Sequence, residues 1–327
     1  MGTTAPDRSG VGGRLSRSEG RQPPLQDVRL RAMDPVRLYR LRGPRRRLAL
    51  HDGSGLWDLS AYLERLGRPN DLVELIEDGW FASAALEPLL PRSGGEGWNA
   101  CDVTFDGNAP ADVDTPLSPA QVGKVLCLGK NFRAHAAEFG EEVPAEPMFF
   151  NKLPETLTAH RATVRVPAWY DRRVDHEAEL AAVIGLQGKD IQLEDAWEHV
   201  GGWTVANDLT ARSLQGDDRK LGHPWLRAKN LDGFLPLGPA IVPRDFLDTA
   251  DVRVTCHVNG ELRQDATTAD WVVDLPHAIA HLSRFLTLRP GDVILMGTPE
   301  GVGPLNNGDH VTCAAAGIGS LETKIER

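Results

Sequence analysis

The sequence lacks any apolar run that approaches the length of about eighteen residues needed to span a bilayer, which excludes membrane insertion. It contains only four cysteines, and they are scattered without a C-x-x-C pair, so neither a zinc site nor a disulfide framework is predicted. The pattern G-x-x-x-x-G-K-S/T is also absent, which excludes a phosphate-binding loop of that type. Unpaired cysteines favour a reducing compartment, and the predicted location is the cytoplasm.

Positive charge is in short supply as well. The chain has a formal net charge of −10 and a pI near 5.5. Nucleic-acid binding is driven by basic side chains that neutralise phosphates, so no nucleic acid is expected as a partner. Arginines in the first 50 residues are the local exception. Residues 1–30 hold Gly, Ser, Arg and Pro but no apolar core of a signal peptide, and we predict a disordered tail there.

The rest of the chain falls into two regions with different sequence patterns. Residues 31–120 predict a small N-terminal α+β domain, with an early hairpin and helices over Ser60–Leu66, capped by Ser60, and over Asp71–Leu90. Residues 121–327 contain many short β-rich runs and few helical intervals, and Asn259-Gly260 is the signal for a two-residue hairpin turn. We therefore predict an α+β fold whose second domain is a folded-over, mostly antiparallel sheet, a sandwich or a roll.

The run Val174–Gly185, VDHEAELAAVIG, predicts a strand that starts acidic and ends apolar. Side chains two residues apart share a face of a strand, so Glu177 and Glu179 would lie side by side, roughly 6.6 Å apart. At an effective dielectric constant of about 20 their charges would repel by roughly 2.5 kcal/mol, which predicts a cation nearby. The alternative is an exposed strand end that happens to be acidic.

A third carboxylate follows the next predicted strand. Asp208 precedes a helical pattern on which Arg212 and Gln215 fall at i+4 and i+7, so the three would share one face. The alternative role of Asp208 is N-cap of a helix that begins at Leu209. Three carboxylates without His or Cys partners are hard oxygen ligands, which indicate Mg²⁺, Mn²⁺ or Ca²⁺. Mg²⁺ is our choice.

A strand also leads into the segment Gly129–Gly140, in which His135 and Glu138 stand at i, i+3. A carboxylate that orients an imidazole makes a general base near neutral pH, and the two flanking glycines would let the segment move as a lid. The alternative is an ordinary surface pair.

Two lysines and a turn complete the candidates. Lys152 and Lys229 lie in apolar or aromatic contexts, where an ammonium is either paired or reaches solvent along its stem. Thr298 stands in the Gly-rich turn that follows the strand ending at Met296. Its hydroxyl and the backbone amides could hold a substrate carboxylate, or the segment could be a plain turn.

Together these segments resemble the fumarylacetoacetate hydrolase family, in the branch of acylpyruvate hydrolases, oxaloacetate decarboxylases and hydroxyheptadienedioate isomerases. The resemblance covers roughly Val122–Ile325. The segments that carry it include GKNFRAHAAEFG, FFNK, VDHEAELAAVIG, GGWTVANDLTARSLQ, AKNLDGFLPLGP and LRPGDVILMGTPEGVG. The branch that hydrolyses fumarylacetoacetate itself has a further aspartate ligand where this chain has Leu128, so the chain departs from that branch.

The resemblance implies a mixed β-roll, usually dimeric, that holds Mg²⁺ or Mn²⁺ through three carboxylates, those of Glu177, Glu179 and Asp208. It implies that His135 and Glu138 form a water-activating dyad on a lid, and that Lys229 stabilises an oxyanion. Four further side chains are implied to line the substrate site: Lys152, Arg212, Gln215 and Thr298.

These expectations lead to a first hypothesis and two alternatives. The first is a metal-dependent hydrolase that cleaves a C–C bond in a 1,3-diketo acid of the acylpyruvate type, through dyad-activated water and an enolate held on the metal. The same site could decarboxylate or isomerise oxaloacetate or a 2-hydroxyhepta-2,4-dienedioate. A non-catalytic scaffold that binds a cation is the alternative of another class. The expected partners are a small oxo acid and a second copy of the chain.

Overall fold

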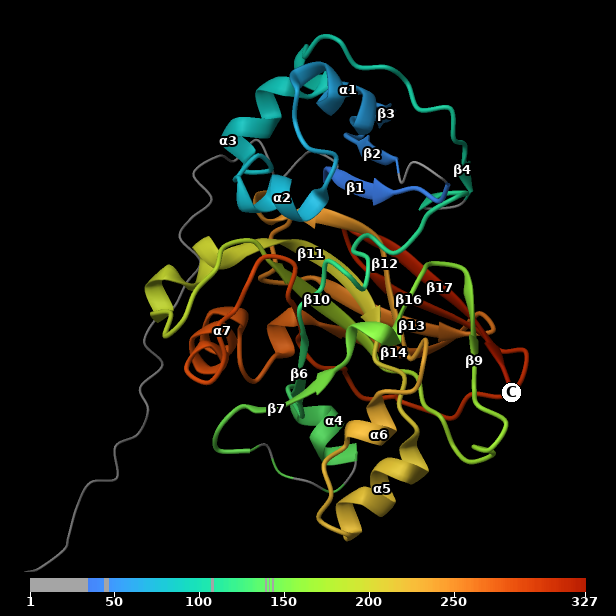
Figure 1. The fold of residues 1–327 in the computed structure, drawn as a ribbon. Coiled ribbons are helices and arrows are strands. Elements are labelled where there is room, and N and C mark those ends of the chain that lie inside the picture. The colour runs from blue at the N-terminus through green and yellow to red at the C-terminus, as the bar shows by residue number, and fades with distance from the viewer. Residues whose placement is uncertain (1–34, 44–46, 107–108, 139, 141, 143) are drawn as a thin grey trace, which may run out of the picture.

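Two β-sheets form most of the computed structural model, which describes residues 35–327 apart from 44–46, 107–108, 139, 141 and 143 (Figure 1). The larger sheet has ten strands. In order across the sheet they are β3 (Leu56–Asp58), β2 (Leu48–His51), β1 (Arg37–Arg40), β12 (Leu235–Pro243), β11 (Val200–Asn207), β10 (Ala178–Ile184), β15 (Val293–Leu295), β6 (Val125–Gly129) and β7 (Met148–Lys152), with β8 (Leu157–Thr158) beside β12. The pairs β15–β6 and β8–β12 are parallel and the others antiparallel, so the sheet is mixed.

The second sheet has five strands. In order they are β14 (Glu261–Thr267), β13 (Arg253–Val258), β16 (His310–Ala315), β17 (Gly319–Glu326) and β9 (Ala162–Arg165). The predicted hairpin turn joins β13 to β14: Asn259 and Gly260 have φ of +52° and +82°, the left-handed pair that a type I′ turn requires. A separate pair, β4 (Phe105–Asp106) and β5 (Ala109–Pro110), lies outside both sheets.

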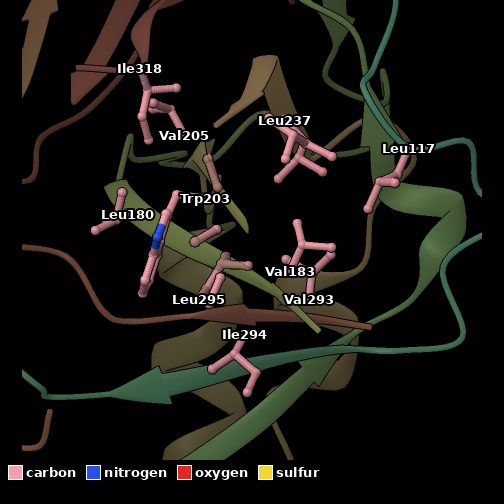
Figure 2. Close-up of a cluster of buried hydrophobic side chains, with 14 of the residues drawn as sticks. Leu117, Leu180, Val183, Trp203, Val205, Leu237, Val293, Ile294, Leu295 and Ile318 are labelled. Carbon is pink, nitrogen blue, oxygen red and sulfur yellow. The ribbon is translucent and has the colours of Figure 1, made fainter. Parts of the chain in front are cut away.

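The core lies where β10, β11 and β12 pack against β13, β16 and β17. Figure 2 shows part of it, with Trp203 of β11 among branched aliphatic side chains. All seven residues of β10 and all nine of β12 are buried, as expected for strands covered on both faces. Each buried large apolar side chain contributes about 1.5–3 kcal/mol relative to exposure, so the middle of this sheet is a rigid base. The predicted α+β class is confirmed.

Helices surround the sheets. They are α1 (Leu59–Leu66), α2 (Leu72–Glu77), α3 (Ser83–Leu86), α4 (Arg133–Glu138), α5 (Arg212–Lys220), α6 (Leu226–Lys229) and α7 (Leu275–Ser283), with short 3₁₀ turns between elements. No helix among the described residues has both the length and the apolar composition to cross a bilayer.

Two local predictions in the N-terminal region are wrong. Asp58, not Ser60, caps α1, because the Asp58 carboxylate accepts from the amide of Ala61 while the Ser60 hydroxyl binds the amide of Leu48. The single helix predicted over Asp71–Leu90 is broken into α2, α3 and a 3₁₀ turn. Gly79 lies at the break with φ of +69°, a conformation that ends an α-helix.

The N-terminal strands belong to the larger sheet, because β1 pairs with β12 through Leu38 and Ile241. Helix α2 adds a second contact. Ile76 of α2 packs against Gly185 and Gly201 of the sheet, where there is no room for a larger side chain. A Cβ atom would lie 2.7 Å from the Cγ2 atom of Ile76 at Gly185 and 2.3 Å from it at Gly201. The two-domain division near residue 120 stays a prediction, and the predicted tail, 1–30, lies outside the described residues.

A buried carboxylate organises the loops of this N-terminal region. Asp52 accepts hydrogen bonds from the hydroxyl of Ser54 at 2.7 Å, the indole of Trp57 at 3.0 Å and the amide of Arg92 at 2.9 Å. Burial raises the pKa of Asp52, but these hydrogen bonds outweigh burial and hold the pKa below its ordinary value. Asp52 therefore stabilises the region in its charged form.

Candidate active site

The antiparallel register of β10 and β11 assembles three carboxylates. Ala178 pairs with Asn207, and the amide of Asp208 donates to the carbonyl of Glu177 at 2.8 Å. This places Asp208 beside the start of β10, and oxygens of Glu177, Glu179 and Asp208 all lie within 4.8 Å of one another. Their exposed fractions are 4, 2 and 0%. The alternative of an exposed acidic strand end is therefore wrong.

Asp208 does not cap a helix, so that alternative is also wrong. Helix α5 begins only at Arg212, after Ala211, and no side chain caps it. Of the three side chains expected to share a face, Arg212 and Gln215 meet on α5, whereas Asp208 lies outside that helix. The guanidinium of Arg212 donates to the amide oxygen of Gln215 at 2.7 Å and to Asp175 at 2.8 Å, and it also pairs with Glu177.

Both lysines are buried among the carboxylates, so neither reaches solvent. The ammonium of Lys229 lies 2.7 Å from Glu177 and 2.6 Å from Asp208, and 4.7 Å from the ring centre of Phe150. Lys152 lies 2.8 Å from the other oxygen of Asp208 and donates to the Lys229 carbonyl at 2.6 Å. The cation predicted near the carboxylates is thus partly supplied by the chain.

This charge arrangement gives the carboxylates different protonation behaviour. Burial raises the pKa of Glu177, but Lys229, Arg212 and His135 outweigh it and hold the pKa well below its ordinary value. Burial and the negative charges of Asp208 and Glu177 raise the pKa of Glu179 well above its ordinary value. The two carboxylates therefore differ because, among the described residues, only Glu177 forms ion pairs with basic side chains.

The donor set fits a divalent metal. Within the described part of the chain no basic side chain pairs with Glu179, whose carboxylate accepts a hydrogen bond from the amide of Gly297 at 2.6 Å. A buried carboxylate without a positive partner is costly, and a divalent cation on this cluster would remove that cost. All three candidate donors are carboxylate oxygens, the type that Mg²⁺ and Mn²⁺ prefer.

The His–Glu pair lies on the short helix α4. The Nδ1 atom of His135 is 3.4 Å from the Glu138 carboxylate, which also accepts from the amide of Gly301 at 3.3 Å. The His135 side chain is only 12% exposed, so the alternative of an ordinary surface pair does not hold for it. Burial lowers the pKa of His135 below its ordinary value, which favours the neutral imidazole that a general base requires.

One cavity of about 280 Å³ collects most of the predicted site residues. Eight of the ten line it: His135, Glu177, Glu179, Asp208, Arg212, Gln215, Lys229 and Thr298. Glu138 and Lys152 do not line it. Each contacts a residue that does line it, Glu138 through His135 and Lys152 through Asp208. The structure therefore gives Lys152 a role in positioning Asp208, and it does not support the predicted contact of Lys152 with a substrate.

Three residues that sequence reasoning missed hold this site together. The amide nitrogen of Gln264 donates to the hydroxyl of Thr298 at 2.7 Å, and its oxygen accepts from the amide of Ala178 at 3.0 Å. Asn207 accepts from the amide of Glu177 at 2.9 Å, and Asp175 pairs with Arg212. Asp175 stands in the acidic run that drew attention to the strand, whereas a lone amide such as Gln264 gives no signal in a sequence.

Comparison with known proteins decides the family. The model of the C-terminal domain of fumarylacetoacetate hydrolase matches residues 124–326. The chain belongs to the fumarylacetoacetate hydrolase family. The resemblance seen in the sequence is thereby confirmed, and every residue that lines the cavity lies within the matched range.

Relatives in this family are enzymes. The human mitochondrial oxaloacetate tautomerase FAHD2A is 37% identical over 92% of this chain and 94% of its own length. A fumarylacetoacetate hydrolase structure from Exiguobacterium antarcticum has a TM-score of 0.71 at 31% identity, covering 89% of this chain and 99% of that one. Fumarylpyruvate hydrolase from Pseudomonas aeruginosa, solved with Mn²⁺ and pyruvate, has a TM-score of 0.60 at 36% identity, covering 63% of this chain and 90% of that one. This chain is therefore an enzyme of the family, and the scaffold alternative is set aside.

Proposed function

We propose that this enzyme moves a proton between the keto and enol forms of a 2-oxo dicarboxylic acid of the oxaloacetate type, with Mg²⁺ or Mn²⁺ bound. The observation that carries the proposal is that His135, with its lowered pKa, and the three carboxylates line one cavity. The oxaloacetate tautomerase relative supports the choice of reaction, because it matches 92% of this chain, including the N-terminal region.

The side chains divide the work. Glu177, Glu179 and Asp208 would hold the cation, which when bound polarises the 2-oxo group and makes a proton on the neighbouring carbon more acidic. His135 takes that proton at its ring nitrogen and returns it to the other end of the enol system. Glu138 orients the imidazole and stabilises its charged form, and Lys229 balances negative charge that develops on the substrate oxygen.

Hydrolysis of a C–C bond in an acylpyruvate, the first hypothesis from the sequence, stays as the second candidate. The support is the fumarylpyruvate hydrolase structure with Mn²⁺ and pyruvate, which is 36% identical to this chain. In that reaction His135 would take a proton from water, and the water oxygen would attack the distal carbonyl. The C–C bond would then break to give a carboxylic acid and the enolate of a 2-oxo acid, which takes the proton back from His135. Both proposed reactions use His135 as the base. They differ in whether a water molecule lies between His135 and the substrate.

The test is a substrate panel with purified protein and Mg²⁺ or Mn²⁺. The loss of ultraviolet absorbance is followed for enol-oxaloacetate, acetylpyruvate, fumarylpyruvate and a hydroxyheptadienedioate. We expect tautomerisation of oxaloacetate that is lost in His135→Ala and kept in His277→Ala, a matched variant whose imidazole pairs with Asp274 at 2.6 Å outside the cavity. Turnover of acetylpyruvate alone would replace the proposal by the hydrolase, and full activity of His135→Ala would remove the base.

Other properties follow as proposals. Mg²⁺ is the proposed resident ion, with Mn²⁺ as the alternative that the fumarylpyruvate hydrolase complex supports. Metal titration of stripped protein measures the order of affinities, with Ca²⁺ included. The homodimer is checked by sedimentation, and the cytoplasmic location by fractionation, since the human relative is mitochondrial.

A further inference from the structure

Strand β7 carries two neighbouring phenylalanines, Phe149 and Phe150, which lie on opposite faces because successive side chains of a strand alternate. Of the two, only Phe150 lines the cavity. The ring of Phe149 packs on the other side, with its centre 6.1 Å from that of His281 on α7 and 5.8 Å from that of Phe285. Two chemically identical side chains therefore differ in a single respect, which is contact with the site.

The ring of Phe150 covers the ammonium group of Lys229. The Nζ atom lies over the ring, 4.7 Å from its centre, and a cation is attracted to an aromatic face within about 6 Å. The side chain of Lys229 is 3% exposed, and Trp225 meets Phe150 edge to face with ring centres 5.5 Å apart. The ammonium is thus shielded from water, and a cation–π interaction is stronger where water is excluded.

The backbone that carries this lysine is fixed by the same two elements. The carbonyl of Trp225 accepts hydrogen bonds from the amides of Ala228 and Lys229, both at 3.1 Å, in the short helix α6 that ends at Lys229. The carbonyl of Lys229 accepts a hydrogen bond at 2.6 Å from Lys152, which follows Phe150 by two residues on the same face of β7. Strand β7 therefore holds both the backbone and the ammonium group of Lys229.

An ammonium group has three N–H donors, and Lys229 uses two of them on carboxylates. They bind Glu177 at 2.7 Å and Asp208 at 2.6 Å, and no third acceptor for this ammonium is found among the described residues. The ring of Phe150 lies against the group instead. Because the ring attracts the whole charge and not one particular hydrogen, it can hold the ammonium in place while the third N–H donates to a substrate oxygen.

We propose that Phe150 is a positioning residue, whose ring holds the ammonium group of Lys229 by a cation–π interaction so that one N–H meets the substrate oxygen on which negative charge develops. This inference rests on the proposed function for the role of Lys229. A phenylalanine that only filled the cavity wall would act through its shape. A positioning residue of this kind acts through the negative charge of the ring face, and the two roles can be separated by experiment.

The experiment replaces Phe150 by phenylalanines with one, two or three ring fluorines in the Mg²⁺-loaded enzyme. Each fluorine withdraws electron density from the ring face and weakens its attraction for a cation, while the shape of the ring changes little. The kcat for oxaloacetate should fall stepwise, to about tenfold below the wild type with three fluorines. KM should change little, because the ammonium acts on charge that develops in the transition state. The same replacements at Phe149 are the matched control and should leave kcat unchanged.

A stability measurement separates this inference from the reaction itself. Thermal unfolding in chelator compares the trifluorinated ring at position 150 in the wild type and in Lys229→Met. Fluorination should lower the unfolding temperature of the wild type by about 3 °C and leave that of Lys229→Met unchanged, because methionine carries no charge. This coupling supports the inference even where the wild type turns over no oxaloacetate, a result that defeats only the proposed function. Equal lowering in both backgrounds, no lowering in the wild type, or a measurable kcat that fluorination at position 150 leaves unchanged overturns the inference.

Discussion

Replacing Lys229 by methionine removes one charge from the centre of the site while keeping a side chain of similar length. The ammonium is 2.7 Å from Glu177 and 2.6 Å from Asp208, and the side chain is 3% exposed. Removing one partner of a buried ion pair costs about 3–5 kcal/mol, because the other charge is left buried without compensation. At about 2–4 °C for each kcal/mol, the metal-free variant should unfold about 10 °C below the wild type.

The same substitution should strengthen metal binding. In the wild type the ammonium of Lys229 donates hydrogen bonds to Glu177 and Asp208, two of the three expected metal ligands. It would also repel the metal: at an effective dielectric constant of about 20, a unit charge and a divalent charge about 5 Å apart repel by several kcal/mol. Because the carboxylates relax when the lysine is removed, we expect a smaller net gain, a Kd for Mg²⁺ about tenfold lower. Activity should fall, since the group that balances oxyanion charge is gone.

Thermal unfolding in chelator and in saturating Mg²⁺ measures both effects. The variant should be less stable than the wild type in chelator and should gain more stability from Mg²⁺ than the wild type does. Lys189→Met is the matched control, because that exposed lysine donates to the backbone carbonyls of Ser283, the last residue of α7, and of Arg284, which caps the helix. Equal unfolding temperatures of Lys229→Met and the wild type in chelator would refute the assigned charge balance.

Three further perturbations test other parts of the structure. Glu179→Gln should raise the stability of the metal-free protein by about 1–3 kcal/mol, since it removes a buried charge without a cationic partner, and should abolish the gain from Mg²⁺ in the same unfolding assay. Asp52→Asn should cost about 1–3 kcal/mol at pH 7 in urea denaturation. Because the pKa of Asp52 is lowered by folding, its contribution is complete above the unfolded-state pKa and is lost as pH falls through the folded-state pKa, so the two proteins should converge in acid. Gly201→Ala places a methyl group 2.3 Å from the Cγ2 atom of Ile76 and should lower the free energy of unfolding by about 1–3 kcal/mol. In a background that carries Ile76→Ala the same substitution should cost less, so additive costs in this double-mutant cycle would contradict the packing.

Part of this site could be predicted because its signals are local. A predicted strand that is apolar except for two carboxylates on one face is unusual, so Glu177 and Glu179 can be identified as candidate site residues from the sequence. His135 and Glu138 are one helical turn apart, so their meeting requires only a helix. The Asn259-Gly260 turn is equally local, since two left-handed residues fix it.

The rest depends on contacts between distant segments. Asp208 was expected in the cluster on a helical face, whereas it is the β10–β11 register that brings it there. Lys152 was expected against substrate, but its partner is a carboxylate 56 positions away in the chain, and such pairs leave no periodic pattern. Gln264 is beyond local reasoning altogether, because its role arises only where β14, β10 and the turn at Thr298 meet.

The pairing of β1 with β12 limits how far this enzyme can be shortened. A fragment that starts near residue 121 would retain every residue of the cavity, and β8 would still pair with the start of β12. The fragment would nevertheless lose the pairing of β1 with β12 at Ile241, in a strand with nine buried residues. An unpaired apolar strand edge can pair with strands of other molecules, so we expect the fragment to aggregate. A minimal catalytic version therefore needs either the N-terminal hairpin or a β12 edge redesigned with charged side chains.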